Sequence, residues 1–381
     1  MSPWSSLLAR LRHPLIQAPM AGVQDSALAV AVSRAGALGS LPAAMLDAAG
    51  LDRELQRLNR DLGADGLPYS VNFFCHAPPT PDAQREAAWR QMLAPYGAQW
   101  GVDLSQPAAA PQRQPFHSEL ADVLAAARPP VVSFHFGLPA PELLDRVKAW
   151  GAVVMSSATT VDEALWLQAR GVDAVIAQGL EAGGHRGHFL RPDHDLTGQL
   201  PLQHLLPALR AALGLPLVAA GGLGSADAVA AARGCGADAV QVGTAFLLCD
   251  EAKTPPLHRR ALSRAAQLVA QPSNCRALEA QVHGTTALTR LFTGRPARGL
   301  VNRLMRELDP MTPVAPAFPL AGAGLALLRS QAEAAGQDDF SPLWSGQFPQ
   351  GCRAVPAATM VDTLMAQWAA CEALEPDRLR S

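Results

Sequence analysis

The chain has 381 residues, of which 49% are hydrophobic and 17% are charged, and its formal net charge is -2 at pH 7. A chain of this length and composition is expected to fold around a full hydrophobic core, and extensive disorder is not expected. The nearly balanced charge argues against a strong attraction to nucleic acid or to an anionic membrane. A small molecule is therefore the expected partner.

The cysteines and the opening stretch bear on the cellular location. The six cysteines are scattered and include no CxxC pair, which indicates reduced thiols instead of a disulfide framework. The opening stretch MSPWSSLLARLRHPL is interrupted by Arg10, Arg12 and His13 and lacks the pattern of a secretory signal. No run of about 18 apolar residues predicts a membrane span. We therefore expect a cytoplasmic protein.

Short apolar segments alternate with segments of helical spacing from residue 15 to residue 250. Eight such segments favour an α/β fold of the parallel (β/α)8 type, the TIM barrel, whose usual size of about 250 residues fits this part of the chain. A doubly wound parallel sheet is the alternative fold. The predicted strands are 15–20, 37–41, 69–74, 131–134, 152–155, 174–177, 216–220 and 239–242, and the predicted helices between the early strands are 26–35, 43–58, 83–93 and 118–127.

Two parts of the chain are predicted from this pattern. Residues 1–250 form the barrel, and residues 75–130 are a long connection within it because they contain helical pieces among many Pro, Ala and Gln residues. Residues 251–381 form a helical extension that covers the barrel and the substrate pocket and ends in an amphipathic helix near 361–374. The apolar helices after Pro310 would either cap the barrel or form a homodimer.

Several predicted strands end in polar residues. Asn72 interrupts the apolar strand 69–74, His135 follows the next strand, and Gln178 ends the sixth. In a TIM barrel these strand ends meet at the C-terminal rim, where such enzymes carry out their chemistry. Beyond Gln178 the loop GLEAGGHRG contains Gly183, which lets the backbone approach a ligand, and brings His185 to the same rim.

Two glycine-containing stretches predict a phosphate site. The stretch AAGGLGS at 219–225 follows the seventh strand, and QVGT at 241–244 ends the eighth. Their backbone N–H groups can bind an anion, and the loops after strands seven and eight are the usual phosphate site of TIM barrels. Two glycine-rich turns without a ligand are the alternative. A phosphate together with buried amides suits flavin mononucleotide, FMN, although a sugar phosphate would fit the cradle equally well.

On these residues the chain resembles the nitronate monooxygenases, formerly called 2-nitropropane dioxygenases, which are TIM-barrel enzymes that bind FMN. The resemblance extends from Pro14 to Glu251. It is carried in order by LIQAPMAGV, SVNFF, VVSFHFG, AQGLEAGGHRG and AAGGLGSADAV through QVGTAF. Several motifs in the same order make the resemblance specific for the superfamily.

The resemblance implies a flavin monooxygenase reaction without a metal. An alkyl nitronate would give one electron to the flavin, and O2 would complete its conversion to a carbonyl compound and nitrite. His185 would be the catalytic residue, and as a group titrating near neutrality it would also deprotonate a neutral nitroalkane. His135 is similar to a second histidine near the substrate, or it is a core histidine bound to backbone. The implied FMN contacts are Ala18, Met20, Asn72, Gln178, Gly183, Gly221, Gly222, Gln241, Gly243 and Thr244.

Two local features of the sequence bear on this prediction. The cluster His185, His188, Asp193 and His194 invites a metal site, but its spacing belongs to a loop and not to one helical face, so no metal is predicted. Related family members contribute tyrosines and a lysine to the substrate pocket from a later segment. The corresponding residues 317–328 of this chain, AFPLAGAGLALL, contain neither residue type, which leaves the substrate open.

Two other functions remain as alternatives. The first is a flavin enoyl-thioester reductase that uses NADH or NADPH, since related barrels share the glycine-histidine loop. No GxGxxG motif of a second nucleotide-binding fold is present, although barrels bind nicotinamide without it. The second is a non-catalytic flavin-binding protein, which the missing tyrosines and lysine would explain.

Overall fold

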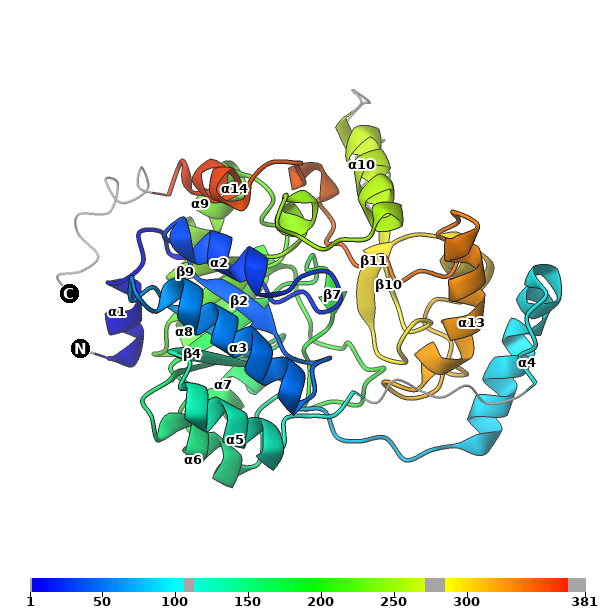
Figure 1. Cartoon of the computed structure of the whole chain (residues 1–381), viewed down its shortest axis with the longest axis horizontal. Helices are drawn as coiled ribbons and strands as arrows, with labels where there is room; N and C mark the ends of the chain where they lie inside the picture. Colours follow the sequence, from blue (N-terminus) through cyan, green and yellow to red (C-terminus); the bar gives the residue numbers. More distant parts are fainter. Residues whose placement is uncertain (1, 106–112, 271–284, 369–381) are drawn as a thin grey trace.

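The computed structural model describes residues 2–105, 113–270 and 285–368. Eight parallel strands form a nearly closed barrel with the order β1-β9-β8-β6-β5-β4-β3-β2, and a bridge between Ile16 and Leu38 joins its two ends (Figure 1). The predicted TIM barrel is therefore confirmed. The barrel strands are β1 (Leu15–Gln17), β2 (Gly39–Pro42), β3 (Tyr69–Phe74), β4 (Val131–His135), β5 (Val153–Ala158), β6 (Ala174–Gln178), β8 (Leu217–Ala220) and β9 (Ala239–Val242).

The sequence prediction located all eight barrel strands. The strands predicted at 69–74 and 239–242 coincide with β3 and β9, and the others differ by a few residues at their ends. Two strands differ by three residues at their C-terminal end: β5 continues to Ala158 instead of residue 155, and β1 ends at Gln17 instead of residue 20. Pro19 has no N–H to donate, so the ladder to β9 does not continue through it.

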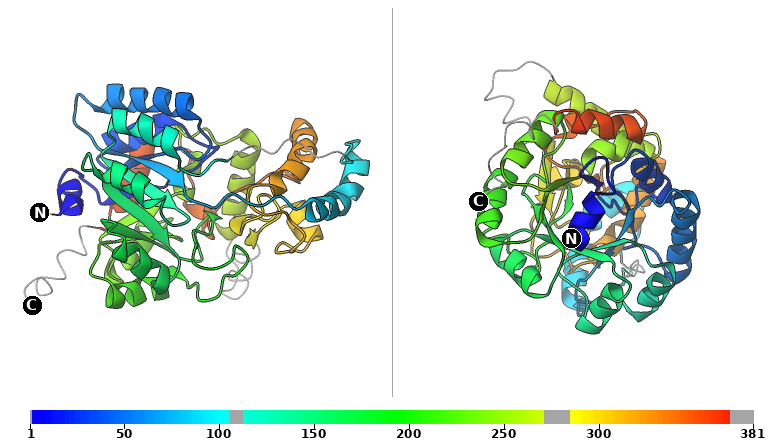
Figure 2. Two further views of the ribbon diagram at one scale, coloured as in Figure 1. Left: turned by 90° about the horizontal axis from the view of Figure 1, so that it is seen from below. Right: turned by 90° about the vertical axis from the view of Figure 1, so that its left-hand side faces the viewer.

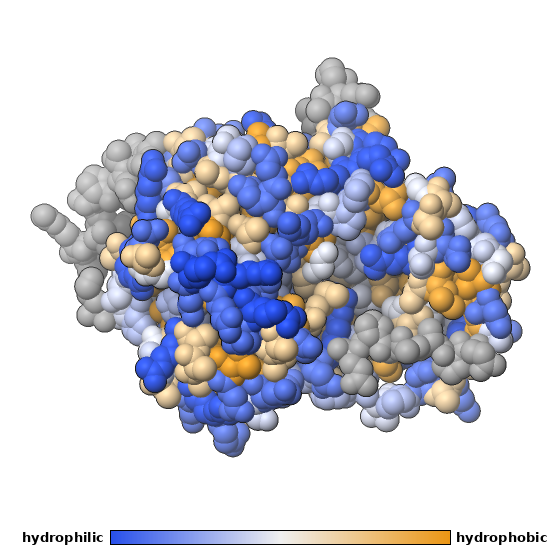
Figure 3. All heavy atoms as spheres, viewed as in Figure 1, coloured by the Kyte–Doolittle hydropathy of each residue, from blue (hydrophilic) through white to orange (hydrophobic). Residues whose placement is uncertain are grey.

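A ring of helices surrounds the strands, as the view along the barrel in Figure 2 shows. The leucines of α3 recur at helical spacing and are fully buried, whereas hydrophilic side chains gather over the outer face of this helix (Figure 3). The helices of the ring are α2 (Ser26–Arg34), α3 (Ala48–Leu62), α5 (Ser118–Ala127), α6 (Pro141–Lys148), α7 (Val161–Ala169), α8 (Leu202–Ala212) and α9 (Ala226–Gly234).

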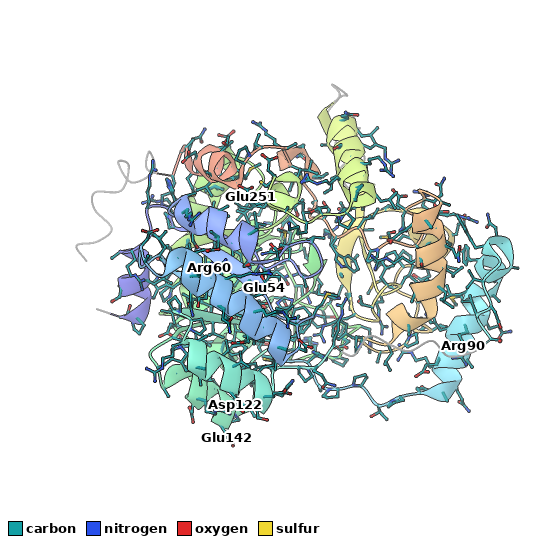
Figure 4. The ribbon with its side chains drawn as sticks, viewed as in Figure 1. Glu54, Arg60, Arg90, Asp122, Glu142 and Glu251 are labelled. Atoms are coloured by element: carbon teal, nitrogen blue, oxygen red, sulfur yellow. The ribbon has the colours of Figure 1, made fainter. Side chains whose placement is uncertain are left out.

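Two glutamates join elements that are distant in sequence (Figure 4). The carboxylate of Glu54 on α3 accepts a hydrogen bond of 2.9 Å from the N–H of Ser26 in the first turn of α2. Glu251 accepts one of 2.9 Å from Ala357, the first residue of α14 (Ala357–Met365). Both carboxylates lie at helix N-termini, where a negative charge is stabilised by the helix dipole.

The N-terminal end of the barrel is closed by α1 (Pro3–Leu8). Trp4 and Leu7 of this helix belong to the same buried cluster as Ile16 and Met155 of the barrel strands. The right-hand view of Figure 2 shows α1 across this end of the barrel. A functional cavity is therefore confined to the opposite end, where the strands end.

A second hydrophobic cluster lies beyond the C-terminal end of the barrel (Figure 2, left). Its core joins Trp89 and Leu93 of α4 (Ala83–Trp100) to Leu325 and Leu328 of α13 (Ala321–Ala334). The sequence prediction treated residues 75–130 as a connection within the barrel, but α4 packs on α13 and not on the barrel wall. The division of the chain at residue 250 stays a prediction.

The sequence predicts a helical extension after residue 250, but this segment also contains strands. It contains β10 (Thr286–Thr289) and β11 (Ala297–Leu300), which pair in an antiparallel manner, and β11 pairs further with β7 (Gly184–His185) of the loop after β6. These strands are too short for periodicity to reveal, and their pairing is long-range. The other described elements of this segment, besides α13 and α14, are α10 (Pro256–Ala270), α12 (Arg303–Glu307) and η2 (Pro349–Gly351), and η1 (Thr244–Leu248) lies directly before it.

The last helix differs from the predicted range 361–374. It begins earlier, at Ala357 directly after Pro356, a residue suited to the start of a helix, and ends at Met365. The predicted part beyond residue 368 lies outside the described residues. Among the helices that the structure describes, none is both long and apolar enough to cross a membrane.

Candidate active site

A cavity opens at the C-terminal ends of the barrel strands, and its wall includes every residue that the sequence predicted for the site. Among the described residues that line it, there is no aspartate or glutamate. The roles of these residues in binding a cofactor or a substrate stay predictions, and their contacts within the protein are described next. The predicted residues in the wall are Ala18, Met20, Asn72, His135, Gln178, Gly183, His185, Gly221, Gly222, Gln241, Gly243 and Thr244.

The glycine loops after β8 and β9 lie next to each other because these two strands are paired. Gly221 and Gly222 have φ values of 121° and 74°, a region in which an L side chain is strained. Within the described residues, the N–H groups of Gly221, Gly222 and Gly243 donate no hydrogen bond to the protein. The side chain of Ser225 caps α9 by accepting from the N–H of Ala228, so an anion here would also face a helix N-terminus.

Asn72 is oriented from below by β4. Its Nδ2 atom donates to the carbonyl and the hydroxyl oxygen of Ser133, at 3.2 Å and 3.0 Å. These bonds satisfy the amide nitrogen of a side chain that is only 6% exposed, and they direct Oδ1 away from β4. Asn72 is thus a fixed acceptor in the cavity wall, as expected of a polar residue within an apolar strand.

The loop from Gly179 to Gly187 is held by Gln178. Its Nε2 donates to the carbonyl oxygen of His185 at 2.9 Å, and its Oε1 accepts from the N–H of Gly187 at 2.8 Å. Both ends of the amide therefore bind the loop, which makes Gln178 a clamp for the backbone around His185. Its predicted contact with a flavin would use only its remaining lone pair and N–H.

Two further side chains fix the same loop. Arg186 is fully buried and donates to the carbonyl oxygens of Gly179 and Gln178 at 2.7 Å and 2.9 Å. The carboxylate of Glu181 accepts from the N–H of Leu202, the first residue of α8, at 3.0 Å. Glu181 thus serves a structural role, and neither side chain is free to act as an acid or base.

His185 lies in β7 and pairs with Ala297 of β11. Its Nε2 is 3.0 Å from Oγ1 of Thr293, and this hydroxyl donates to the carbonyl oxygen of Arg295 at 3.3 Å. Because the only hydroxyl proton of Thr293 is used in that bond, Nε2 of His185 carries the ring proton and donates to Thr293. Nδ1 is therefore the basic nitrogen, and it has no protein hydrogen bond within the described residues.

The surroundings of His185 hold its imidazole neutral. Burial lowers its pKa well below the usual value, and the positive charges of Arg113 and Arg295 act in the same direction. The sequence had suggested a group that titrates near neutrality, and this expectation is wrong for the protein alone. A neutral ring at pH 7 can accept a proton at Nδ1.

His135 lies behind the loop and contacts protein atoms with both ring nitrogens. Nδ1 is 2.6 Å from the hydroxyl of Ser157, and Nε2 is 3.3 Å from the carbonyl oxygen of His185. Burial lowers its pKa to about 3, so it stays neutral. Of the two roles that the sequence left open, these contacts favour one that supports the loop.

Aromatic side chains from the barrel strand β3 and from the segment after residue 250 surround His185. The ring centroids of Phe318, Trp344 and Phe74 lie 5.2 Å, 5.5 Å and 6.1 Å from that of His185. Phe318 belongs to the segment 317–328, in which the sequence showed no tyrosine or lysine. The pocket at this side is therefore apolar, apart from Arg113.

The polar residues of the site that were not predicted from the sequence include Thr293, Arg113 and His258. His258 on α10 lines the cavity and is 5% exposed, and its Nε2 has no hydrogen-bond partner among the described residues. An orphaned buried nitrogen in a cavity wall is typical of a ligand contact. No local motif marks these residues, because each comes from a segment far from the strand ends.

Residues of the histidine and aspartate cluster at 185–194 have protein partners. Asp193 binds Arg295 at 2.6 Å, and Nε2 of His188 lies 3.2 Å from the carbonyl oxygen of Asp193. Within the described part of the chain, no three His, Cys, Asp or Glu side chains are grouped as metal ligands would be.

A family model and individual relatives of known sequence identify the same family. The chain matches the family "Nitronate monooxygenase" over residues 5–367. It is 40% identical over 374 residues to the nitronate monooxygenase of Pseudomonas aeruginosa, which covers 94% of this chain and 97% of the relative. The nitronate monooxygenase of Paraburkholderia phytofirmans is 38% identical over 365 residues, covering 94% and 92%.

Solved structures give a matching result. The nitroalkane oxidase of Streptomyces ansochromogenes superposes with a TM-score of 0.83 at 37% identity and covers 97% of this chain and 99% of that chain. FabK of Thermotoga maritima has a TM-score of 0.69 at 23% identity, with 98% of both chains covered. The second likeness concerns the fold alone.

Proposed function

Because this chain belongs to the nitronate monooxygenase family, an oxidoreductase class that depends on flavin, we propose that it oxidises alkyl nitronates with O2 on bound FMN. The products would be a carbonyl compound and nitrite. The observation that carries the proposal is a neutral His185 with a free Nδ1 in an apolar cavity, opposite loops suited to a phosphate. When bound, the flavin supplies the acceptor for the electrons of the substrate.

The cavity wall fits FMN. The N–H groups of Gly221, Gly222 and Gly243 have no protein acceptor among the described residues and would bind the phosphate. Two neighbouring loops make one cradle, which suits a cofactor with one phosphate group. Asn72 offers an acceptor on the opposite side, and Nε2 of His258 offers a further polar contact.

His185 can hold a proton next to the substrate by two routes. A bound nitronate places a negative charge beside the ring and raises its pKa, so Nδ1 takes up a proton from solvent. A neutral nitroalkane instead gives its own α-proton to Nδ1, the basic nitrogen. Both routes lead to the same pair, a nitronate anion beside a histidine protonated at Nδ1.

The first test is the visible spectrum of the purified protein, followed by anaerobic addition of propyl-2-nitronate. Flavin bands that change on addition, with nitrite formed once air is admitted, are the expected result. A coloured protein whose bands respond to NADPH or NADH but not to nitronate would favour an enoyl-thioester reductase. A protein that responds to neither would favour a non-catalytic flavin-binding protein, and one that cannot bind FMN would refute the flavin site.

Substituting Gly222 by valine should reduce FMN affinity by at least roughly tenfold. A side chain is strained at a φ of 74°, and its Cβ would lie 3.3 Å from the ring of Phe348 in the cradle. Gly236→Val is the matched control, because Gly236 has a φ of 99° but lies outside the cavity wall. Fluorescence titration with FMN measures both variants, and equal affinities would remove the phosphate role from this loop.

Substituting Thr293 by valine should lower kcat by up to roughly tenfold at unchanged FMN content. The change keeps the shape of the side chain but removes the acceptor that fixes the proton on Nε2 of His185. Thr293→Ser retains a hydroxyl and should recover most of the rate. If valine and serine behave alike in steady-state assays, Thr293 does not position the ring.

A further inference from the structure

Arg113 is the one arginine in the described wall of the cavity, and it comes from the long connection between β3 and β4. Its backbone is fixed by its carbonyl oxygen, which lies 3.0 Å from Nε2 of His76. Its guanidinium carbon lies 5.9 Å from the ring centroid of Phe318. The same phenylalanine packs against His185, so Arg113 and His185 flank one part of the cavity.

The guanidinium of Arg113 has no hydrogen bond, carboxylate or backbone acceptor among the described residues. No acidic residue occurs in the described wall of the cavity, and residues 106–112 before it contain no aspartate or glutamate. Burial lowers its pKa from the usual arginine value, and nearby Arg329 acts in the same direction. A partly buried cation without a counter-ion is costly, which favours binding of an anion.

Arg295, the other arginine close to His185, is already paired. It binds Asp193 at 2.6 Å and the carbonyl oxygen of His188, and its guanidinium stacks at 4.0 Å over the ring of Phe136. Its charge is thus compensated within the protein. Of these two arginines, Arg113 is therefore the one whose positive charge a bound anion would neutralise.

The position of Arg113 separates it from the phosphate cradle. It contacts His76 and Phe318 beside the ends of β3 and β4, whereas the cradle follows β8 and β9. In the strand order of the barrel, β3 and β8 are four places apart among eight, which puts them on opposite sides. The anion that Arg113 would bind is therefore not the cofactor phosphate.

We propose that Arg113 binds the negatively charged group of the substrate beside His185 and determines the affinity for anionic substrates. The inference rests on the proposed function, since it assigns a residue to the substrate of the same site. The proposal also explains how a pocket without a lysine in residues 317–328 can still bind an anion. Phe318 of that segment supplies an apolar wall, and Arg113 of a different segment supplies the positive charge.

The test compares Arg113→Gln, Arg113→Lys and the control Arg329→Gln in the FMN-loaded protein. Arg329 is a suitable control because it forms an ion pair with Glu333 and does not line the cavity. The substitution Arg329→Gln therefore removes only a nearby positive charge. In Arg113→Gln the KM for propyl-2-nitronate should rise by roughly tenfold to a hundredfold, with a smaller change in kcat. Arg113→Lys should recover at least half of the lost affinity on a logarithmic scale, and Arg329→Gln should stay within about twofold of the parent protein.

A titration with sodium nitrate at constant ionic strength gives a readout without turnover. Nitrate is planar and monoanionic like the nitronate group, and its affinity should fall at least roughly tenfold in Arg113→Gln alone. Equal nitrate affinity and equal KM in Arg113→Gln and the parent would overturn the proposal, as would loss of FMN from this variant. A parent protein that binds nitrate through Arg113 but oxidises no nitronate would refute the proposed reaction and keep the anion site.

Discussion

Replacing His185 by alanine is expected to lower kcat/KM for nitronates and nitroalkanes by roughly 10²–10⁴-fold while FMN stays bound. The large loss follows because Nδ1 of His185 is the basic nitrogen beside the aromatic residues of the pocket. FMN should remain because the loop is held by Gln178 and Arg186, whose bonds reach backbone atoms and not the imidazole. Steady-state oxygen consumption and the flavin absorbance of the same sample measure the two quantities.

The exposed His204 on α8 supplies the matched control, since His204→Ala removes an imidazole that does not line the cavity. His185→Gln keeps a polar group of similar length but cannot take up a proton near neutral pH, and it should be as inactive as the alanine variant. Turnover within threefold of the parent in His185→Ala would rule out the proton-holding role. Loss of FMN together with activity would instead make His185 a cofactor-binding residue.

Much of the barrel and of its rim could be predicted because the signals are local. Each strand is a short apolar run, and its polar residue lies inside the same segment, as Asn72 does, or ends it, as Gln178 does. Parallel strands in a barrel all end at one rim, so local strand ends become one site without knowledge of any long-range contact. The glycine loops around Gly222 and Gly243 became neighbours for the same reason.

The contacts that decide the chemistry of His185 were not predictable in this way. Thr293 lies 108 residues further along the chain and stands beside the ring only because β11 pairs with β7. The pKa of His185 is lowered first by burial and then by the charges of Arg113 and Arg295, which come from two separate segments. Periodicity and turn signals carry no information on such long-range contacts, so a neutral ring could not be predicted from them.

The free energy of unfolding is expected to fall by roughly 4 kcal/mol between pH 7 and pH 5 through His76 and His258 alone. Burial lowers the pKa of each to about 4, and each side chain is 5% exposed. Below the usual histidine pKa of 6.5 the unfolded chain therefore binds protons that the folded protein does not. Stability is lost as the pH falls from about 6.5 toward 4, and the neutral His135 adds to the loss because its pKa is lowered to about 3.

Urea unfolding at a series of pH values measures this slope, and one substitution assigns it. His76→Phe keeps an aromatic ring against Phe318, whose centroid lies 4.8 Å away, but removes the titrating group. The loss of stability between pH 7 and pH 5 should then shrink by about 2 kcal/mol, whatever the variant's stability at pH 7. His204→Phe on the surface is the control and should leave the slope as in the parent. Equal slopes in His76→Phe and the parent would mean that His76 has the same pKa in the folded and the unfolded protein, so that its burial does not lower the pKa.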